Sequence, residues 1–236
     1  MKKIKYLVFI FILFAGFLFS NLSNLKAQQV STSQNMEPGV QEGELLADII
    51  ISKFEDAESW TGQMPLDQGN IFLMKRYGKP NALPQVDPTT GIENKYVLGV
   101  KVMFNKRGFN RFIVRPPRPI KVPGITKSLS IWVAGRNFGH TLIFVVRDYY
   151  NQDKLLKVGT LNFLGWKKLT FVIPPTLVQD EYHYTELEGI TFMGLAVETN
   201  PEESYGTFYV YFDELTAKTN VFNMSTQDKD DMIDNW

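Results

Sequence analysis

A two-residue alternation of side-chain character is the feature of this sequence that most restricts its fold. In residues 206–219, Phe208, Val210 and Phe212 are predicted to face one way, while Tyr209 and Tyr211 face the other. This period is that of a β-strand with a buried and an open face. Ten segments rich in β-branched and aromatic residues are predicted to be strands: residues 49–54, 71–76, 95–104, 109–115, 128–133, 141–148, 155–161, 167–173, 189–198 and 206–219.

The segments between these strands carry turn and loop signals instead of helical ones. Only residues 176–187 are compatible with a short helix or turn. Proline-rich stretches at residues 84–91 and 115–119 predict a long loop and an extended connection, and residues 137–140 predict a hairpin turn. We therefore expect an all-β sandwich of two packed antiparallel sheets.

Residues 1–27 have the pattern of a secretory signal peptide. A basic start precedes an apolar run over residues 7–19, and Ala27 is a suitable residue at the cleavage point. The run is shorter than the roughly 20 residues of a membrane-spanning helix. We expect export across the inner membrane and cleavage after Ala27, with no membrane attachment afterwards. The alternative is an uncleaved membrane anchor.

The remaining chain is predicted to contain one domain. Residues 28–46 form a polar, flexible leader, residues 47–219 the β-sandwich, and residues 220–236 an acidic tail. The absence of Cys excludes disulfides, thiolate catalysis and a lipoprotein anchor.

Catalytic motifs are missing from the sequence. It contains no GxSxG, HExxH, P-loop or GxGxxG pattern. His140 and His183 are the two histidines, and we interpret both as surface or tyrosine-stacked residues. We expect no enzyme activity, with a two-carboxylate glycosidase as the open alternative.

Charge is segregated along the chain. Net charge is −6 over residues 28–94, +13 over residues 95–168 and −11 over residues 180–236. Such asymmetry favours partner binding, and no nucleic-acid recognition motif accompanies it. The candidate residues for binding an acidic partner surface are Lys106, Arg107, Arg111, Arg115 and Arg118. The alternative is that basic and acidic strands lie side by side and cancel.

Two acidic pairs are candidates for a structural calcium site. Glu55 and Asp56 follow the first predicted strand, and Asp213 and Glu214 lie in the last. First and last strands of a sandwich are often neighbours, so we expect Glu55 and Asp213 to meet and to bind calcium, which takes oxygen ligands. The alternative is two exposed acidic pairs.

Aromatic residues near predicted loops and at the tail suggest two kinds of binding. Trp60, Phe138, Tyr149 and Tyr150 are candidates to stack on sugars, with core packing as the alternative. Trp236 ends a polar tail that offers it no local core, so we expect it to dock on a neighbouring molecule. The alternative is that the tail folds back on its own sandwich.

Several stretches, taken in their order along the chain, resemble jelly-roll, galactose-binding-like domains. They include a Gly-Trp segment before an apolar strand and a final strand that carries Asp213. Within that class the chain is similar to the spirochaetal flagellar filament outer layer (sheath) protein family, FlaA. The stretches are residues 54–55, 129–148, 165–174, 189–195, 208–215 and 234–236.

The resemblance implies a structural, non-enzymatic role in the periplasm. Members of that family coat the flagellin core of periplasmic flagella and influence filament stiffness, shape and motility. Flagellin core subunits and other sheath proteins would be the partners in a helical filament, with no catalytic residues and no cofactor beyond a possible calcium at Glu55 and Asp213. A secreted carbohydrate-binding module is the alternative, and a bound glycan is possible in either case.

Overall fold

The computed structural model describes residues 46–88, 91–181 and 188–221, all within one compact unit, Gln41–Trp236. The predicted signal peptide, almost all of the leader, most of the tail, His183 and Trp236 lie outside the described residues. The described chain is all-β, as predicted. Its elements are β1 (Leu46–Ser52), a 3-10 turn η1 (Ala57–Ser59), β2 (Thr61–Gln63), β3 (Gly69–Tyr77), β4 (Tyr96–Phe104), β5 (Arg111–Arg115), β6 (Ile120–Lys121), β7 (Ile125–Arg136), β8 (Thr141–Arg147), β9 (Asp153–Thr160), β10 (Leu164–Val172), β11 (Thr191–Glu198) and β12 (Thr207–Asn220).

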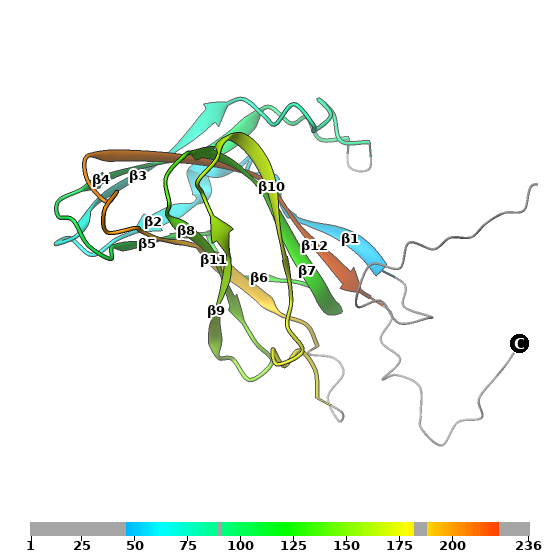
Figure 1. The fold of residues 1–236 in the computed structure, drawn as a ribbon. Helices are drawn as coiled ribbons and strands as arrows, with labels where there is room; N and C mark the ends of the chain where they lie inside the picture. Colours follow the sequence, from blue (N-terminus) through cyan, green and yellow to red (C-terminus); the bar gives the residue numbers. More distant parts are fainter. Residues whose placement is uncertain (1–45, 89–90, 182–187, 222–236) are drawn as a thin grey trace, which may run out of the picture. The chain divides into compact units, whose positions relative to one another are not determined.

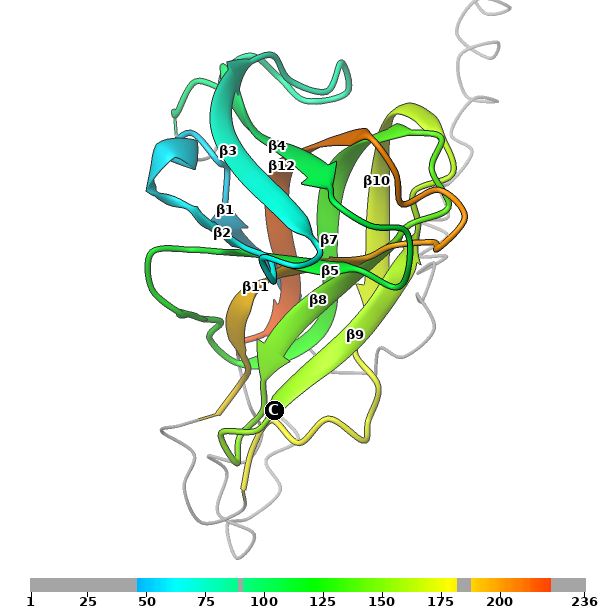
Figure 2. The ribbon, with the colours of Figure 1, turned by 90° about the vertical axis from the view of Figure 1, so that its left-hand side faces the viewer.

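The strands form two antiparallel sheets that pack face to face (Figure 1). Sheet A has the order β10-β7-β12-β4-β3, and β1 pairs with the second half of β12. Sheet B has the order β2-β5-β11-β8-β9, and β6 continues alongside β11 beyond β5. In Figure 2, β8 and β9 of sheet B lie in front of β7 and β10 of sheet A. The first and last strands are neighbours, as the sequence analysis expected.

The core lies between the sheets because each strand turns alternate side chains inward. Phe208, Val210 and Phe212 of β12 are at most 1% exposed, whereas Tyr209 on the opposite side is 37% exposed, so the predicted faces are confirmed. Burying each large apolar side chain contributes roughly 1.5–3 kcal/mol. The alternation slips by one residue at Glu214, which has a φ of 37° and lies in a register shift of β12.

Residues 137–140 join two sheets and do not close a hairpin, so that prediction was wrong. They connect β7 of sheet A to β8 of sheet B, and the backbone N–H of Asn137 donates to Phe163 O instead of to β8. A turn signal fixes a local bend but not the partner of the following strand. The two loops predicted around residues 84–91 and 115–119 are confirmed as connections between β3 and β4 and between β5 and β6.

In the described part of the chain, no helix has the length and apolar character needed to cross a membrane.

Candidate docking surface and buried charge cluster

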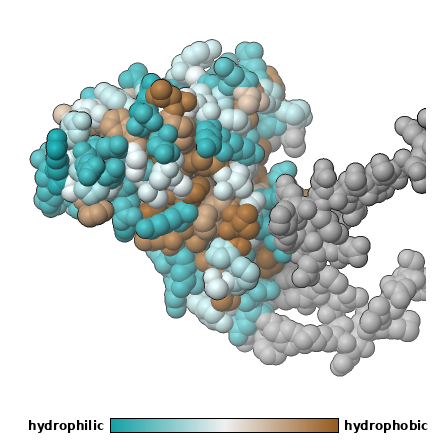
Figure 3. Space-filling view, viewed as in Figure 1, coloured by the Kyte–Doolittle hydropathy of each residue, from teal (hydrophilic) through white to brown (hydrophobic). Residues whose placement is uncertain are grey.

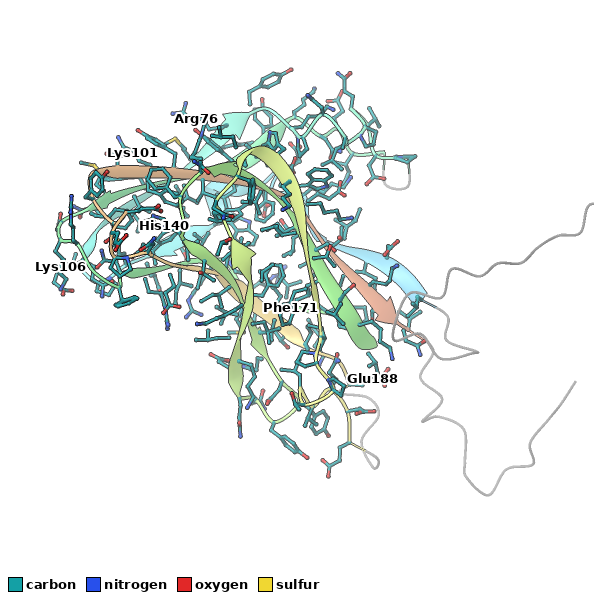
Figure 4. All side chains as sticks on the ribbon, in the orientation of Figure 1. Arg76, Lys101, Lys106, His140, Phe171 and Glu188 are labelled. Atoms are coloured by element: carbon teal, nitrogen blue, oxygen red, sulfur yellow. The ribbon has the colours of Figure 1, made fainter. Side chains whose placement is uncertain are left out.

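The five basic residues predicted to bind a partner do not lie on one surface. Lys106 and Arg107 occupy the loop between β4 and β5 (Figure 4), where Lys106 pairs with Asp67 and the Arg107 guanidinium lies 4.6 Å from the ring centre of Tyr205. The Lys106 ammonium holds the pKa of the Asp67 carboxyl below its usual value. At this tip of the sandwich the charge of Lys106 is therefore paired within the molecule, and Arg107 packs on a ring.

Arg111 and Arg115 lie on β5, on the outer side of sheet B. Arg111 pairs with Glu198 of β11 at 3.0 Å, and the hydrogen bond from Arg111 lowers the pKa of that carboxyl. Lys157 of β9 approaches the same carboxylate at 3.6 Å. Opposite charges thus meet across neighbouring strands here, as the alternative interpretation expected, and the blocks of charge in the sequence are partly cancelled.

Arg118 lies in the connection between β5 and β6 and lines a pocket of about 510 Å³. Glu55 and Trp60 line the same pocket, next to the end of β1. Trp60 is only 4% exposed and packs on Phe54 with ring centres 4.7 Å apart. Trp60 is therefore a core residue, and the prediction that it stacks on a sugar was wrong.

Glu55 and Asp213 come together as expected, in a buried charge cluster with Lys53 and Asp87. Lys53 forms a buried ion pair with Asp87. Glu55 Oε1 accepts hydrogen bonds from the backbone N–H groups of Lys95 and Tyr96, at 2.6 and 3.1 Å. This cluster fastens the connection between β3 and β4 to the end of β1.

Asp213 is the most deeply buried carboxylate of the cluster and the one with an unsatisfied oxygen. It is 2% exposed; its Oδ1 accepts the backbone N–H of Glu214 at 2.8 Å, whereas its Oδ2 has no hydrogen-bond partner among the described residues. Burial, helped by the nearby Glu214 and Glu55 carboxylates, raises the pKa of the Asp213 carboxyl to about 7, although the hydrogen bond from the Glu214 backbone N–H and the Lys53 ammonium act to lower it. The folded protein therefore holds a proton on Asp213 up to a higher pH than the unfolded chain does.

The side chains in this cluster do not complete a calcium site. Calcium takes six to eight oxygen ligands, and the described residues contain no group of three or more His, Cys, Asp or Glu side chains placed to hold a metal ion. One Glu55 oxygen is already used by two backbone amides, and Lys53 brings positive charge to the same place. Calcium at Glu55 and Asp213 stays a prediction.

His140 is buried among phenylalanine rings, so its interpretation as a surface or tyrosine-stacked residue was wrong. It lies between the sheets (Figure 4) at 0% exposure, 4.6 Å from the ring of Phe208 and 5.3 Å from that of Phe138. Its Nδ1 accepts the backbone N–H of Asn200 at 3.2 Å. Burial lowers the His140 pKa to about 4, and the ring is neutral at physiological pH.

The outer face of sheet A carries an aromatic and basic surface that the sequence analysis missed. Strand register places Trp166, Ala134, Tyr211, Gly99 and Met74 in one row across the five strands of the sheet. At about 4.8 Å between strands, the row is about 19 Å long. Large side chains alternate with Ala and Gly, so the rings of Trp166 and Tyr211 are separated by small residues.

A second row and three cations complete this surface. Tyr209, Lys101 and Phe72 are register partners on β12, β4 and β3. Lys101 lies 5.8 Å from the Tyr209 ring and Arg136 lies 5.5 Å from the Tyr211 ring. We call the following residues the sheet A platform: Phe72, Met74, Arg76, Lys101, Arg136, Trp166, Tyr209 and Tyr211.

Gly99 allows Arg76 to lie across the platform. An added Cβ at Gly99 would be 3.2 Å from Cγ of both Arg76 and Met74, so both stems approach the bare backbone there. Figure 4 shows Arg76 and Lys101 on the outer side of sheet A. Phe72 is 50% exposed and Tyr209 is 37% exposed, which leaves these rings available for contact.

A separate hydrophobic area lies at the flank where the edge strands β9 and β10 approach each other (Figure 3). On these edge strands Leu155 of β9 is 48% exposed, and Leu164 and Val172, at the two ends of β10, are 78% and 65% exposed. Unlike the platform, this flank lies along the open edges of both sheets.

The chain matches one protein family over most of its length. Residues 24–228 match the family model described as flagellar filament outer layer protein Flaa. A putative flagellar filament outer layer-like protein of Brachyspira hyodysenteriae (strain ATCC 49526 / WA1) is 40% identical over 193 residues, which cover 82% of this chain and 88% of that protein. The flagellar filament outer layer protein of Spirochaeta aurantia is 28% identical over 105 residues, covering 33% of this chain and 31% of that protein.

Solved structures with a similar backbone include carbohydrate-binding modules. One from the β-sandwich superfamily has a TM-score of 0.46 at 13% identity, covering 72% of this chain and 61% of that chain. The family 11 module from Clostridium thermocellum has a TM-score of 0.42 at 10% identity, covering 75% of this chain and 98% of that chain. Likeness at this level carries no argument about ligands.

Proposed function

Because this chain belongs to the flagellar filament outer layer protein family, we propose that it is a structural subunit of the sheath around the flagellin core of a periplasmic flagellum. In this proposal residues 1–27 direct export and are removed, and the mature subunit remains in the periplasm without a membrane anchor. It contacts flagellin and other sheath proteins, affects filament curvature and stiffness, and catalyses no reaction.

The sheet A platform is the observation that supports this role within the family. Its Trp, Tyr, Met and Arg side chains are the types enriched at protein interfaces and at binding hot spots. It lies on the outer face of a hydrogen-bonded sheet, where the strand spacing fixes the distances between the side chains. A rigid face of this kind suits repeated contacts between identical subunits, since little side-chain ordering is required on binding.

The proposal is tested by locating the protein in cells. Flagellar filaments purified from the native cells are probed with an antibody to this chain, and immunogold labels its position by electron microscopy. We expect the chain to copurify with the filaments, to label their outer surface, and to begin at Gln28 by N-terminal sequencing. Recovery only in the soluble periplasmic fraction, with unlabelled filaments, would contradict the proposal.

Carbohydrate binding is the second candidate, and the partly exposed rings of the platform support it, because sugars stack on aromatic faces. This candidate depends on Trp166 and Tyr211 and not on the cations. Neutral oligosaccharides should then be retained by a Lys101→Glu variant and lost by Trp166→Ala, measured by isothermal titration calorimetry. If no glycan in a panel of neutral glycans binds, carbohydrate binding is excluded as the function of this surface.

A further inference from the structure

The cations of the sheet A platform lack acidic partners in the described part of the chain. Arg76, Lys101 and Arg136 have no ion pair with any described carboxylate, in contrast to Arg111 and Lys106 elsewhere on the molecule. Their neighbours are rings and a thioether: Arg76 Nε donates to Met74 Sδ at 2.9 Å. The platform is therefore a surface of uncompensated positive charge interleaved with aromatic rings.

A segment of this chain has the complementary chemistry. Residues 222–236 hold four Asp residues and one Lys, a net charge of −3, together with apolar Met232, Ile233 and Trp236. Carboxylates in this segment match the platform cations, and its apolar side chains match the exposed rings of Phe72 and Tyr209. Opposite charge across an interface supplies register and rejects wrong partners.

We infer that residues 222–236 of a second copy of this chain dock on the sheet A platform, an inference that rests on the proposed sheath function. Chain reach favours a second copy over the same molecule. From Tyr209 to Asn220, β12 runs 11 residues away from the platform, about 36 Å at about 3.3 Å per residue. Asp228 follows Asn220 by eight residues and would reach back only about 26 Å even when fully extended. In the same molecule only the last part of the tail, from about Asp231 onward, could therefore lie on the platform, whereas all four Asp residues of a second copy's tail can do so.

The contact joins two different surfaces, the tail of one copy and the platform of the next. A contact of this type does not close on itself unless the rotation between copies happens to do so, and it otherwise generates an open helical array. The inference thus supplies a subunit contact of the kind that a helical coat needs.

Charge exchange between the two surfaces tests the inference on the mature protein. The platform variant is Lys101→Glu/Arg136→Glu, and the tail variant is Asp228→Lys/Asp230→Lys/Asp231→Lys. Self-association is measured by sedimentation velocity over a concentration series at about 0.15 M salt. We expect each variant alone to associate at least about tenfold more weakly than the unmodified protein, because attraction is replaced by repulsion. A mixture of the two variants should regain association, since each supplies the partner that the other lacks.

The matched control is Lys154→Glu/Lys157→Glu, which makes the same change in total charge on β9 of sheet B, away from the platform on sheet A. It should associate as the unmodified protein does. Unfolding midpoints within about 2 °C of the unmodified protein show that the variants are folded. A second variant, Trp166→Ala, leaves the charge of the platform unchanged and should weaken association because it removes the Trp166 ring from the contact.

Three results would overturn the inference. The first is unchanged association of both charge variants. The second is weakening without recovery in the mixture. The third is a monomer at all concentrations whose stability falls in either variant, which would place the tail on its own platform. Antibody labelling of native filaments does not depend on these association measurements. If the filaments are labelled and any one of the three results is obtained, the docking inference has failed while the proposed sheath function stands.

Discussion

Asp213 offers a quantitative test of the buried charge cluster. We expect Asp213→Asn to stabilise the protein at neutral and alkaline pH. Asn keeps an oxygen to accept the backbone N–H of Glu214 and removes the charge that burial disfavours. Lys53, Asp87 and Glu55 stay in place, so the variant isolates one carboxylate.

The magnitude follows from the pKa of the Asp213 carboxyl, which burial raises from 3.8 to about 7. A difference of about three pH units, at about 1.4 kcal/mol each, corresponds to about 4 kcal/mol. Because the folded-state pKa is raised, this part of the stability is fully present below pH ~4 and is lost as pH rises to about 7. Above that pH Asp213 is ionised in both the folded and the unfolded state, so its contribution to the free energy of unfolding no longer changes with pH.

The assay is urea unfolding of the unmodified protein and Asp213→Asn at pH values from 4.5 to 8, in EDTA. The variant should gain about 3 kcal/mol relative to the unmodified protein between the ends of this range, because part of the titration lies below pH 4.5. Taking the difference between the two proteins cancels the contribution of His140, which both retain. A difference that does not change with pH would refute the assignment of a raised pKa to Asp213.

Repeating the measurement with excess calcium tests the predicted ion at Glu55 and Asp213. An ion held at that site would stabilise the folded protein by about 2.7 kcal/mol at a hundred times its dissociation constant. The gain should appear in the unmodified protein and not in Asp213→Asn. Equal stability with calcium and with EDTA would exclude a calcium site there.

Other changes probe the interior. Burial lowers the His140 pKa from 6.5 to about 4. The neutral ring therefore contributes about 3 kcal/mol to the free energy of unfolding above pH ~6.5, and this contribution is lost as pH falls to about 4. His140→Leu should abolish this pH dependence when unfolding is measured over the same range. Lys53→Met should cost about 3–5 kcal/mol because it leaves Asp87 charged and buried, and Lys53→Met/Asp87→Leu should recover most of the loss in denaturant unfolding. Gly194→Ala should lower the melting temperature measured by calorimetry, because Gly194 has a φ of 149° and an added Cβ would lie 2.4 Å from Val114 O.

Strand patterns in the sequence predicted ten of the twelve strands and the correct face for β12. Phe208 and Tyr209 could be assigned to opposite faces because β12 is buried on one side only. The two missed strands, β2 and β6, have three and two residues. They are too short to show a period, and they exist because β5 and β11 offer edges for pairing.

The candidate sites were less predictable because they depend on pairing between distant strands. Glu55 and Asp213 were paired correctly from a general rule about first and last strands, while the role of Lys53 had no signal in the sequence. The platform joins residues from Phe72 to Tyr211, which only the register brings together. One signal was available: the outward positions of several strands carry rings, where polar side chains are usual.

The position of β12 has a mechanical consequence for a subunit held by its tail. β12 is the strand that leads directly into residues 222–236, and it is hydrogen-bonded to β7 on one side and to β4 and β1 on the other. Tension applied along it loads those ladders in shear, so many bonds must fail together. Peeling an edge strand would break them one by one. When a filament bends, the pull on each tail would therefore act on β12, the strand whose hydrogen bonds to its neighbours must break together.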